Sequence, residues 1–189
     1  MKIISLFLFA AFLVSCGNSN LPGFTKRTAK YEAASPGGTS IKVSIWDQKA
    51  WLLNRAGEAI LETDVATGVP GKETPEGVFP VLERLEEKRS NRYGRIVNKK
   101  TREVVIEKSW EHEGPLPEGT EYEGIEMPYW MRLTWDGVGM HVGKFEKRTL
   151  SSFGCIRVFE KAQPFIFAKT EMGTTVEVVA GSLVEKYSW

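Results

Sequence analysis

The sequence predicts a mainly β domain with one or two short helices. Apolar residues recur at every second position along several short segments, which is the pattern of strands that bury one face. Turn signals containing glycine separate these segments, and a single segment has a helical pattern that ends at a glycine. These observations favour one β-rich domain.

The first strands are predicted on either side of a turn at residues 54–57. Ile41, Val43 and Ile45 occupy alternate positions before this turn, and the pattern returns over residues 59–65. We therefore expect two paired strands here. Further strands are predicted at residues 78–82, 103–107, 132–135, 138–142 and 175–179.

Two local signals predict a hairpin and a helix in the carboxyl-terminal part of the domain. Asp136-Gly137 predicts a two-residue hairpin turn, and this turn places His141 near the end of a hairpin strand. Residues 160–170 predict a helix, because Pro164 suits a first turn and Gly173 follows as a stop.

Length and composition indicate one catalytic or binding domain at residues 40–181. Residues 16–39 contain few large apolar groups and predict a flexible tether, while residues 182–189 are expected to form a C-terminal tail. The formal charge of +1 gives no reason to expect a nucleic-acid partner, which calls for a clustered basic face. We expect the domain to be a monomer.

The amino terminus reads as an export signal. Met1-Lys2 is positively charged, and the apolar run of residues 3–14 is shorter than the about 20 residues that span a bilayer. Residues 13–16 resemble a bacterial lipobox, which predicts a lipoprotein signal peptide at residues 1–15 and lipidation of Cys16 as a membrane anchor. The residue after Cys16 is Gly17, as in lipoproteins that are sent to the outer membrane, so a periplasm-facing location on that membrane is expected. The alternative is an ordinary secretory signal in which Cys16 is incidental.

A histidine and a cysteine form the candidate catalytic pair. Cys155 is the only cysteine outside the leader, and His141, one of two histidines, precedes it by fourteen positions. A thiol has an ordinary pKa of about 8.5, so an imidazole that takes its proton makes it a nucleophile near neutral pH. The alternative is a buried structural cysteine beside a structural histidine.

The second histidine and a metal site are less favourable interpretations. His112 lies in the polar stretch 111–117, which is typical of a solvated surface loop. Two histidines and one available thiol, scattered along the chain, lack the close ligand spacing of zinc sites. No metal and no cofactor are predicted.

The residues around this pair resemble a known family. His141 with Gly143, followed by Ser152, Gly154, Cys155 and Arg157, resembles the signature of L,D-transpeptidases (the YkuD-type catalytic domain), usually written as a histidine followed by Ser-His-Gly-Cys and an arginine. Residues 67–68, 74–79 and 127–129 are similar to that family's approach to its active site, so the resemblance covers roughly residues 41–179. Phe153 stands where many members carry a second histidine, and residues 144–150 are unusually charged.

The resemblance implies a fold and a reaction. The fold is an antiparallel β-sandwich or barrel with the nucleophile at one rim. The reaction is acyl transfer on peptidoglycan stem peptides through a Cys155 thioester, which forms 3→3 crosslinks or attaches protein to the wall. His141 is then the general base, oriented by a main-chain carbonyl near Gly143, and the N–H groups of Gly154 and Cys155 hold the oxyanion.

Four further residues are candidates for substrate binding, each with a structural alternative. Arg157 pairs either with a substrate carboxylate or with an internal carboxylate that braces the loop. Ser152 either donates to substrate or caps the turn. Tyr129 and Trp130 either line the groove or belong to the core.

Two other functions are compatible with the sequence. One is a thiol hydrolase of the same fold, an L,D-carboxypeptidase or endopeptidase, and the other is a lipid-anchored wall-binding module without turnover. Residues 91–125 are rich in Gly, Pro and Glu and suit an exposed insertion that could form a lid over the groove.

Overall fold

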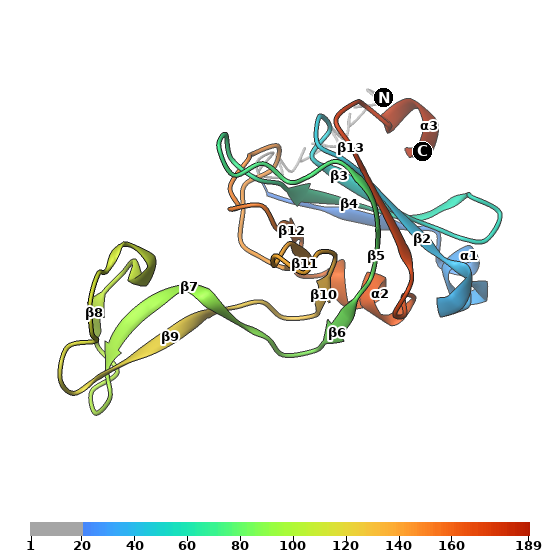
Figure 1. The fold of residues 1–189 in the computed structure, drawn as a ribbon. Coiled ribbons are helices and arrows are strands. Elements are labelled where there is room, and N and C mark those ends of the chain that lie inside the picture. Colours follow the sequence, from blue (N-terminus) through green and yellow to red (C-terminus); the bar gives the residue numbers. More distant parts are fainter. Residues whose placement is uncertain (1–20) are drawn as a thin grey trace, which may run out of the picture.

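A computed structural model describes residues 21–189, and the elements it contains are mostly strands (Figure 1). The predicted signal peptide and the predicted lipidation at Cys16 lie outside the described residues. The mainly β prediction is confirmed. The strands are β1 (Phe24–Lys26), β2 (Ser40–Ser44), β3 (Lys49–Leu53), β4 (Ala59–Ala66), β5 (Gly77–Pro80), β6 (Glu83–Leu85), β7 (Arg89–Asn98), β8 (Val104–Ile106), β9 (Thr120–Glu126), β10 (Trp130–Arg132), β11 (Gly139–Val142), β12 (Ile156–Val158) and β13 (Thr175–Val179).

Short helices connect the strands. The α-helices are α1 (Thr28–Ala33), α2 (Gln163–Ala168) and α3 (Val184–Tyr187), and the 3-10 turns are η1 (Pro36–Gly38) and η2 (Ser109–Glu111). The helix predicted within residues 160–170 is therefore present as α2, with Pro164 in its first turn.

The main sheet is mixed, which corrects the prediction of an antiparallel one. Its strand order is β5-β13-β2-β3-β4-β12-β11-β10-β6, and β1 pairs with β4. The pairs β13–β2 and β11–β12 are parallel. A parallel pair cannot be closed by a tight turn, so the chain between β11 and β12 must run back along the sheet. This connection, residues 143–155, is the cysteine loop, and it brings Cys155 to the starting end of β12 beside the strand that carries His141.

The amino-terminal strands also differ from the prediction. Instead of two paired strands there are three, because β3 lies between β2 and β4. Four of its five side chains are buried, so β3 lacks the alternation that marks a strand with one solvated face.

The β10–β11 hairpin is present with a longer loop than predicted. The Leu133 N–H donates to the Val138 carbonyl at 2.9 Å, so residues 134–137 form a four-residue loop rather than a two-residue turn. Gly137 supplies the positive φ, +105°, within it.

The predicted tether and tail contribute to the fold within the described residues. β1 pairs with β4, and the hydroxyl of buried Tyr31 in α1 donates to the Phe165 carbonyl at 2.8 Å. Pairing with an existing strand orders a segment that has few apolar side chains of its own. At the other end, Leu183 and Tyr187 pack against buried Trp51.

The core lies against the main sheet. Its buried members come from β2, β3, β4, β10–β13 and α2, and include Ile41, Leu52, Met131, Met140, Ile156 and Ile166. Met140 and Ile156 flank the candidate catalytic pair in sequence. The strands that carry this pair are therefore anchored in the core.

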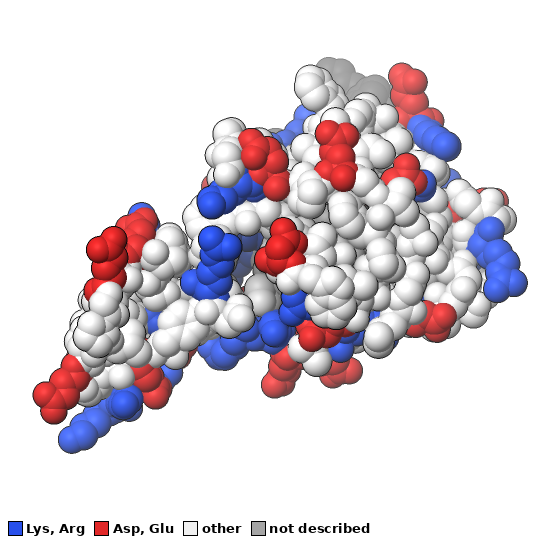
Figure 2. All heavy atoms as spheres, in the orientation of Figure 1, with Lys and Arg blue, Asp and Glu red and all other residues white. Residues whose placement is uncertain are grey.

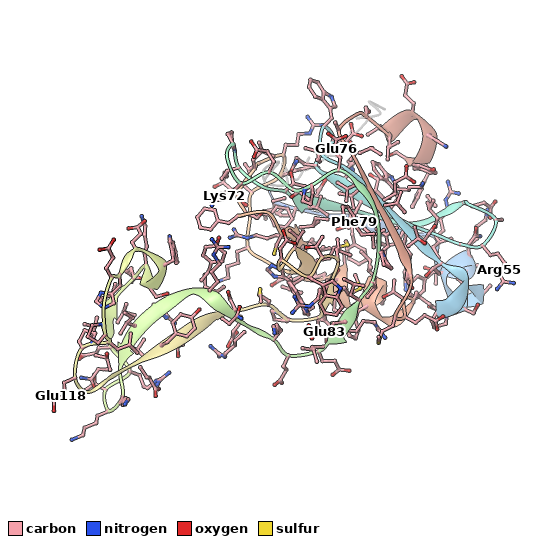
Figure 3. All side chains as sticks on the ribbon, in the orientation of Figure 1. Arg55, Lys72, Glu76, Phe79, Glu83 and Glu118 are labelled. Carbon is pink, nitrogen blue, oxygen red and sulfur yellow. The ribbon has the colours of Figure 1, made fainter. Side chains whose placement is uncertain are left out.

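A second, three-stranded sheet projects from this body (Figure 1). Residues 89–126, here called the insertion, form it in the order β8-β7-β9. β6 pairs with β10, and beyond this pair the Tyr129 N–H donates to Glu86 O and the Met127 N–H to Lys88 O, both at 2.8 Å. The insertion therefore continues the edge of the main sheet as a bent ribbon. Figure 3 shows Glu83 where the ribbon leaves the body and Glu118 at its far tip.

Candidate active site

A groove of about 1330 Å³ lies between the insertion and the body. His141, Cys155 and Arg157 line it from the body, and Arg89, Tyr93 and Trp110 line it from the insertion. Figure 2 shows this hollow, with lysine and arginine side chains gathered along it. The groove is open enough for an extended chain to enter.

The imidazole of His141 is fixed by a backbone carbonyl. Its side chain is only 6% exposed, and Nδ1 lies 2.7 Å from the carbonyl oxygen of Val142. A carbonyl oxygen only accepts, so in the neutral ring Nδ1 carries the hydrogen and Nε2 keeps a free lone pair. The expected orienting carbonyl near Gly143 is thus that of Val142.

Burial also sets the charge of His141. The pKa of His141 is lowered from 6.5 to about 4, chiefly by desolvation; the bond to Val142 opposes this shift and the nearby Arg157 guanidinium adds to it. The ring is therefore neutral at physiological pH, which is the state that a general base requires.

Cys155 stands at the rim of the body, immediately before β12. Its Sγ lies 3.6 Å from the carbonyl oxygen of Gly137, a contact in which the thiol donates. Burial raises the pKa of the thiol, although the Gly139 N–H and the charges of Arg157 and Arg132 oppose this. The resting thiol is therefore protonated.

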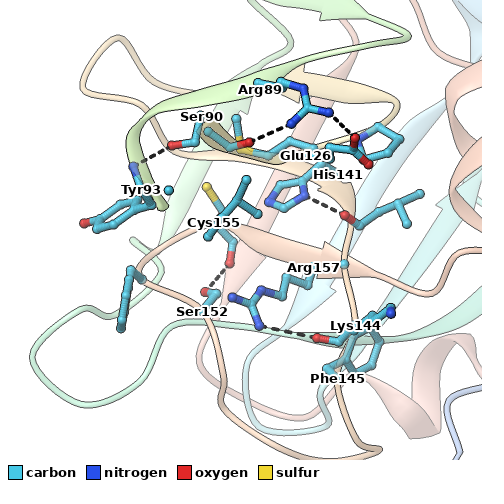
Figure 4. Close-up of a pocket in the computed structure, with 18 of the residues that line it drawn as sticks. Arg89, Ser90, Tyr93, Glu126, His141, Lys144, Phe145, Ser152, Cys155 and Arg157 are labelled. Atoms are coloured by element: carbon cyan, nitrogen blue, oxygen red, sulfur yellow. Dashed lines mark hydrogen bonds and ion pairs between the residues drawn. The ribbon is translucent and has the colours of Figure 1, made fainter. Parts of the chain in front are cut away.

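Cys155 and His141 both line the groove. Figure 4 shows the Cys155 sulfur, immediately before β12, and the His141 imidazole, on the neighbouring β11, directed into the same space. Because both groups are neutral at rest, a nucleophilic thiolate forms only when the thiol passes its proton to the imidazole. The arrangement is suited to thiol chemistry in which proton transfer accompanies attack.

Hydrogen bonds inside the cysteine loop fix the position of Cys155. The buried Ser152 hydroxyl donates to the Cys155 carbonyl and accepts the Gly154 N–H at 3.3 Å. Ser152 thus caps the turn, as its structural alternative predicted. Gly154 adopts a φ of +110°, which a side chain would strain.

Thr74, in the loop before β5, contacts the cysteine loop. Sequence reasoning missed this role. The buried Thr74 hydroxyl donates to the Gly154 carbonyl at 2.9 Å and accepts the Gly68 N–H at 3.0 Å. Gly68 also forms an isolated parallel β-bridge with Ser152. The signal was present, since residues 67–68 and 74–79 belong to the family-like stretches, but spacing alone does not reveal a contact across eighty positions.

Arg157 faces the groove beside His141. Its Nη1 donates to the Lys144 carbonyl at 3.3 Å and lies 3.5 Å from the Ser151 hydroxyl. Within residues 21–189 it forms no ion pair with a carboxylate, so the alternative of an internal carboxylate partner is not seen. The guanidinium instead supports the cysteine loop through these oxygens.

Tyr129 and Trp130 lie behind the site rather than in it. Trp130 is 2% exposed, donates from Nε1 to Glu83 at 2.9 Å, and packs with its ring centroid 6.0 Å from that of His141. Tyr129 packs against Phe167 at 5.4 Å. Neither side chain lines the groove: Trp130 is buried, as its core alternative has it, whereas Tyr129 is partly buried and packs on Phe167 outside the groove.

Comparison with known families identifies the domain. Residues 38–178 match the model of the L,D-transpeptidase catalytic domain, which spans both His141 and Cys155. The chain belongs to this family.

Solved L,D-transpeptidases share the fold. An L,D-transpeptidase from Mycobacterium smegmatis is 18% identical, with a TM-score of 0.56 over 76% of this chain and 59% of that one. The Enterococcus faecium L,D-transpeptidase C442S mutant is 26% identical, with a TM-score of 0.53 over 75% of this chain and 50% of that one. The enzyme LdtMt1 in complex with imipenem is 18% identical, with a TM-score of 0.54 over 75% and 59%. The chain thus spans between half and three-fifths of these proteins. Comparison with curated proteins finds no match.

In this L,D-transpeptidase domain the ring of Phe153 packs against the insertion. The Phe153 centroid lies 5.1 Å from that of Tyr93 and 5.8 Å from that of Trp110. The predicted insertion at residues 91–125 therefore reaches the cysteine loop. Sequence reasoning identified Phe153 as a departure from the family pattern but did not find its partners.

Two further observations concern the described residues only. No helix in residues 21–189 has the length and apolar character needed to cross a bilayer. The same residues hold no cluster of three or more metal-ligating side chains.

Proposed function

We propose that Cys155 and His141 catalyse acyl transfer on peptidoglycan stem peptides. The observation that carries the proposal is that the Cys155 thiol and the neutral His141 ring, whose Nε2 is left free by the bond from Nδ1 to Val142, line one groove. Membership of the L,D-transpeptidase catalytic family supports a substrate in the cell wall.

In the first half-reaction, the His141 Nε2 takes the thiol proton as Sγ attacks the carbonyl between a meso-diaminopimelate centre and a terminal D-alanine. The carbon–nitrogen bond then breaks, and His141 returns the proton to the departing amine of D-alanine. The product is a Cys155 thioester.

In the second half-reaction, an amine attacks the thioester. His141 accepts a proton from the amine and delivers it to the sulfur as the carbon–sulfur bond breaks. The side-chain amine of another diaminopimelate gives a 3→3 crosslink, and a lysine of an envelope protein gives attachment to the wall. The thiol is regenerated in both cases.

The Cys155 N–H is the principal oxyanion donor in this proposal. The Gly154 N–H is directed to the Ser152 hydroxyl at 3.3 Å, so it contributes only if this long contact yields to the substrate. The positive φ of Gly154 turns the backbone at this point.

Arg157 and Lys144 are the proposed carboxylate-binding residues. Both line the groove, and neither is among the ion pairs found within the described residues. A guanidinium bonded only to backbone and hydroxyl oxygens can exchange those contacts for a bidentate pair with a stem-peptide carboxylate.

The proposed location follows from the leader. In this proposal the signal peptide at residues 1–15 directs export and is removed, and a lipid on Cys16 anchors the monomeric protein on the periplasmic side of the outer membrane. This location places the groove next to its substrate.

The direct test incubates purified protein with a defined tetrapeptide muropeptide and analyses the products by mass spectrometry. Transfer gives crosslinked dimers and free D-alanine. We expect Cys155→Ala to abolish both products and His141→Ala to slow them by about 10²–10⁴-fold, as for loss of a general base. His112→Ala, at a half-buried loop histidine that does not line the groove, is the matched control and is expected to retain activity.

Other products would identify the alternatives. Shortened monomers without dimers would indicate a hydrolase of the same fold. Retention on sacculi without any product, unchanged in Cys155→Ala, would indicate a wall-binding module.

A further inference from the structure

We propose that Phe153, Tyr93 and Trp110 form an aromatic clasp that holds the insertion against the cysteine loop and thereby fixes the outer wall of the groove. Phe153 is the central positioning residue of this clasp. The consequence for binding rests on the proposed function, since the wall would contact the stem peptide.

Three separate segments supply the clasp. Tyr93 comes from β7, Trp110 from η2, and Phe153 from the cysteine loop two positions before Cys155. Tyr93 and Trp110 meet at 5.5 Å with an interplanar angle of 76°, and Trp110 and Phe153 at 5.8 Å and 75°. These are the edge-to-face geometries that aromatic rings prefer, so the contact is specific as well as apolar.

Within residues 21–189, no other aromatic pair, side-chain hydrogen bond or ion pair joins the insertion to the body. Every side-chain hydrogen bond found for residues 89–126 has its partner inside the same range. Examples are Arg89 with Gly124, Arg95 with Glu123, and Tyr122 with Ser90. The buried hydrophobic clusters found in the described residues include none from the insertion. The insertion is therefore attached to the body at two places. One is the edge of the main sheet that it continues, and the other is the clasp.

The position of the clasp gives it a role in binding. All three aromatic residues line the groove, and Phe153 stays 45% exposed although its ring packs on two others. An extended peptide that passes Cys155 runs along these exposed faces. Opening the clasp would release the wall while leaving the bond between His141 and Val142 in place.

The test uses Phe153→Ala in the full chain, with Phe153→Tyr as the conservative variant that keeps the ring. Hydrogen exchange measured by mass spectrometry reports the clasp directly. Loss of two aromatic contacts is expected to raise amide exchange in β7 and η2 by about tenfold, with Phe153→Tyr restoring protection. The matched control is Trp46→Ala, which removes an exposed aromatic residue that does not line the groove.

Kinetics with the tetrapeptide muropeptide test the consequence for binding. We expect Phe153→Ala to raise KM by about tenfold with kcat within about twofold, because the wall contributes to binding and the reacting groups stay in place. Alkylation of Cys155 by iodoacetamide, which is too small to need the wall, is expected not to slow.

Each result decides a separate claim. Unchanged exchange in β7 and η2 would overturn the clasp, whether or not the protein turns over peptide. Faster exchange with unchanged KM would overturn its role in binding. If the wild-type protein yields no product, the proposed function fails, and the exchange measurement still decides the clasp.

Discussion

The body and the insertion are both β-structures, but they are stabilised differently. The body buries one continuous cluster of aliphatic and aromatic side chains between its sheet and α2. The insertion buries Ile96 and Val97 and otherwise exposes most of its side chains. The candidate catalytic residues are therefore carried by the body, whereas the wall proposed to meet substrate belongs to a region with fewer buried side chains, which favours lower local stability.

The charges of the two regions reinforce this contrast. Arg89–Glu126, Arg95–Glu123 and Arg102–Glu121 pairs lie on the exposed faces of the β7–β9 ribbon. Exposed pairs contribute little to stability. In the body, buried Asp64 accepts the Gly23 N–H and lies 3.7 Å from both Lys49 and Lys147, which ties β1 and the cysteine loop to β4.

The largest predicted effect compares one core residue from each region. Leu52→Ala in β3 is expected to lower the free energy of global unfolding by about 2–5 kcal/mol, because a cavity forms in the core. Ile96→Ala in β7, at a fully buried position of the insertion, is expected to speed amide exchange within residues 89–126 with a smaller change in global unfolding. Denaturant titration measures the free energy of global unfolding, and hydrogen exchange measures local opening of the insertion. Equal losses of global unfolding free energy in the two variants would show that the body and the insertion unfold as one cooperative unit.

Sequence reasoning located the chemistry of the body better than the insertion. Cys155 and His141 were found because a lone thiol and a nearby histidine are rare residue types in a family-like pattern. β3 was missed because a strand buried on both faces carries no alternation. The parallel β11–β12 pair was missed because pairing direction depends on the path of the cysteine loop, which spacing does not reveal.

The insertion shows a different limit of sequence reasoning. Residues 91–125 were recognised as an exposed insertion, but β7 and β9 were not predicted as a ribbon. Gly94 and Gly124 interrupt the pattern of this ribbon, and each lies where a Cβ would approach the partner strand within 2.4 Å or less. Likewise, Tyr129 and Trp130 were grouped with the groove because they adjoin it in sequence, although they pack behind it.

The next effect concerns the pH dependence of the body. The pKa of His141 falls to about 4 in the folded protein, below the ordinary 6.5, so the unfolded chain binds the proton first as pH falls. The contribution of the neutral His141 ring to the free energy of unfolding is therefore fully present above pH about 6.5. It is lost as pH falls towards 4, by about 3 kcal/mol for a shift of this size.

His141→Asn is expected to remove the part of the pH dependence of the unfolding free energy that comes from His141. Urea titrations between pH 4 and 7 measure this dependence. Acidic groups elsewhere contribute equally to both proteins. Parallel profiles for the wild type and the variant would contradict a buried neutral imidazole.

A smaller effect is expected at two glycines with positive φ, one in each region. Gly154→Ala forces a side chain into a φ of +110° and is expected to cost about 1–2 kcal/mol and to slow product formation, since it moves Cys155. Gly114→Ala, at a φ of +90° in the insertion, imposes similar strain without contact to the site. Activity assays at matched folded fractions separate them; equal activities would show that the turn at Gly154 does not position the thiol.

The smallest effect is expected on the exposed face of the ribbon. Arg102→Gln removes pairs with Glu121 and Glu123 and is expected to leave the global unfolding midpoint unchanged within error. Raising the salt concentration should reduce any residual difference in amide exchange of β9. A clear loss of global stability would show that charge pairs, rather than apolar burial, hold the insertion.

The acyl-transfer account rests on Cys155 as a nucleophile, and trapping it with imipenem tests this most directly. The wild-type protein is incubated with imipenem, digested and mapped by mass spectrometry, so that Cys155 is distinguished from Cys16. The account predicts a covalent adduct on the peptide containing Cys155, formed more slowly in His141→Ala and absent in Cys155→Ala. An unmodified Cys155 in the folded wild-type protein, or an adduct that persists in Cys155→Ala, would contradict it.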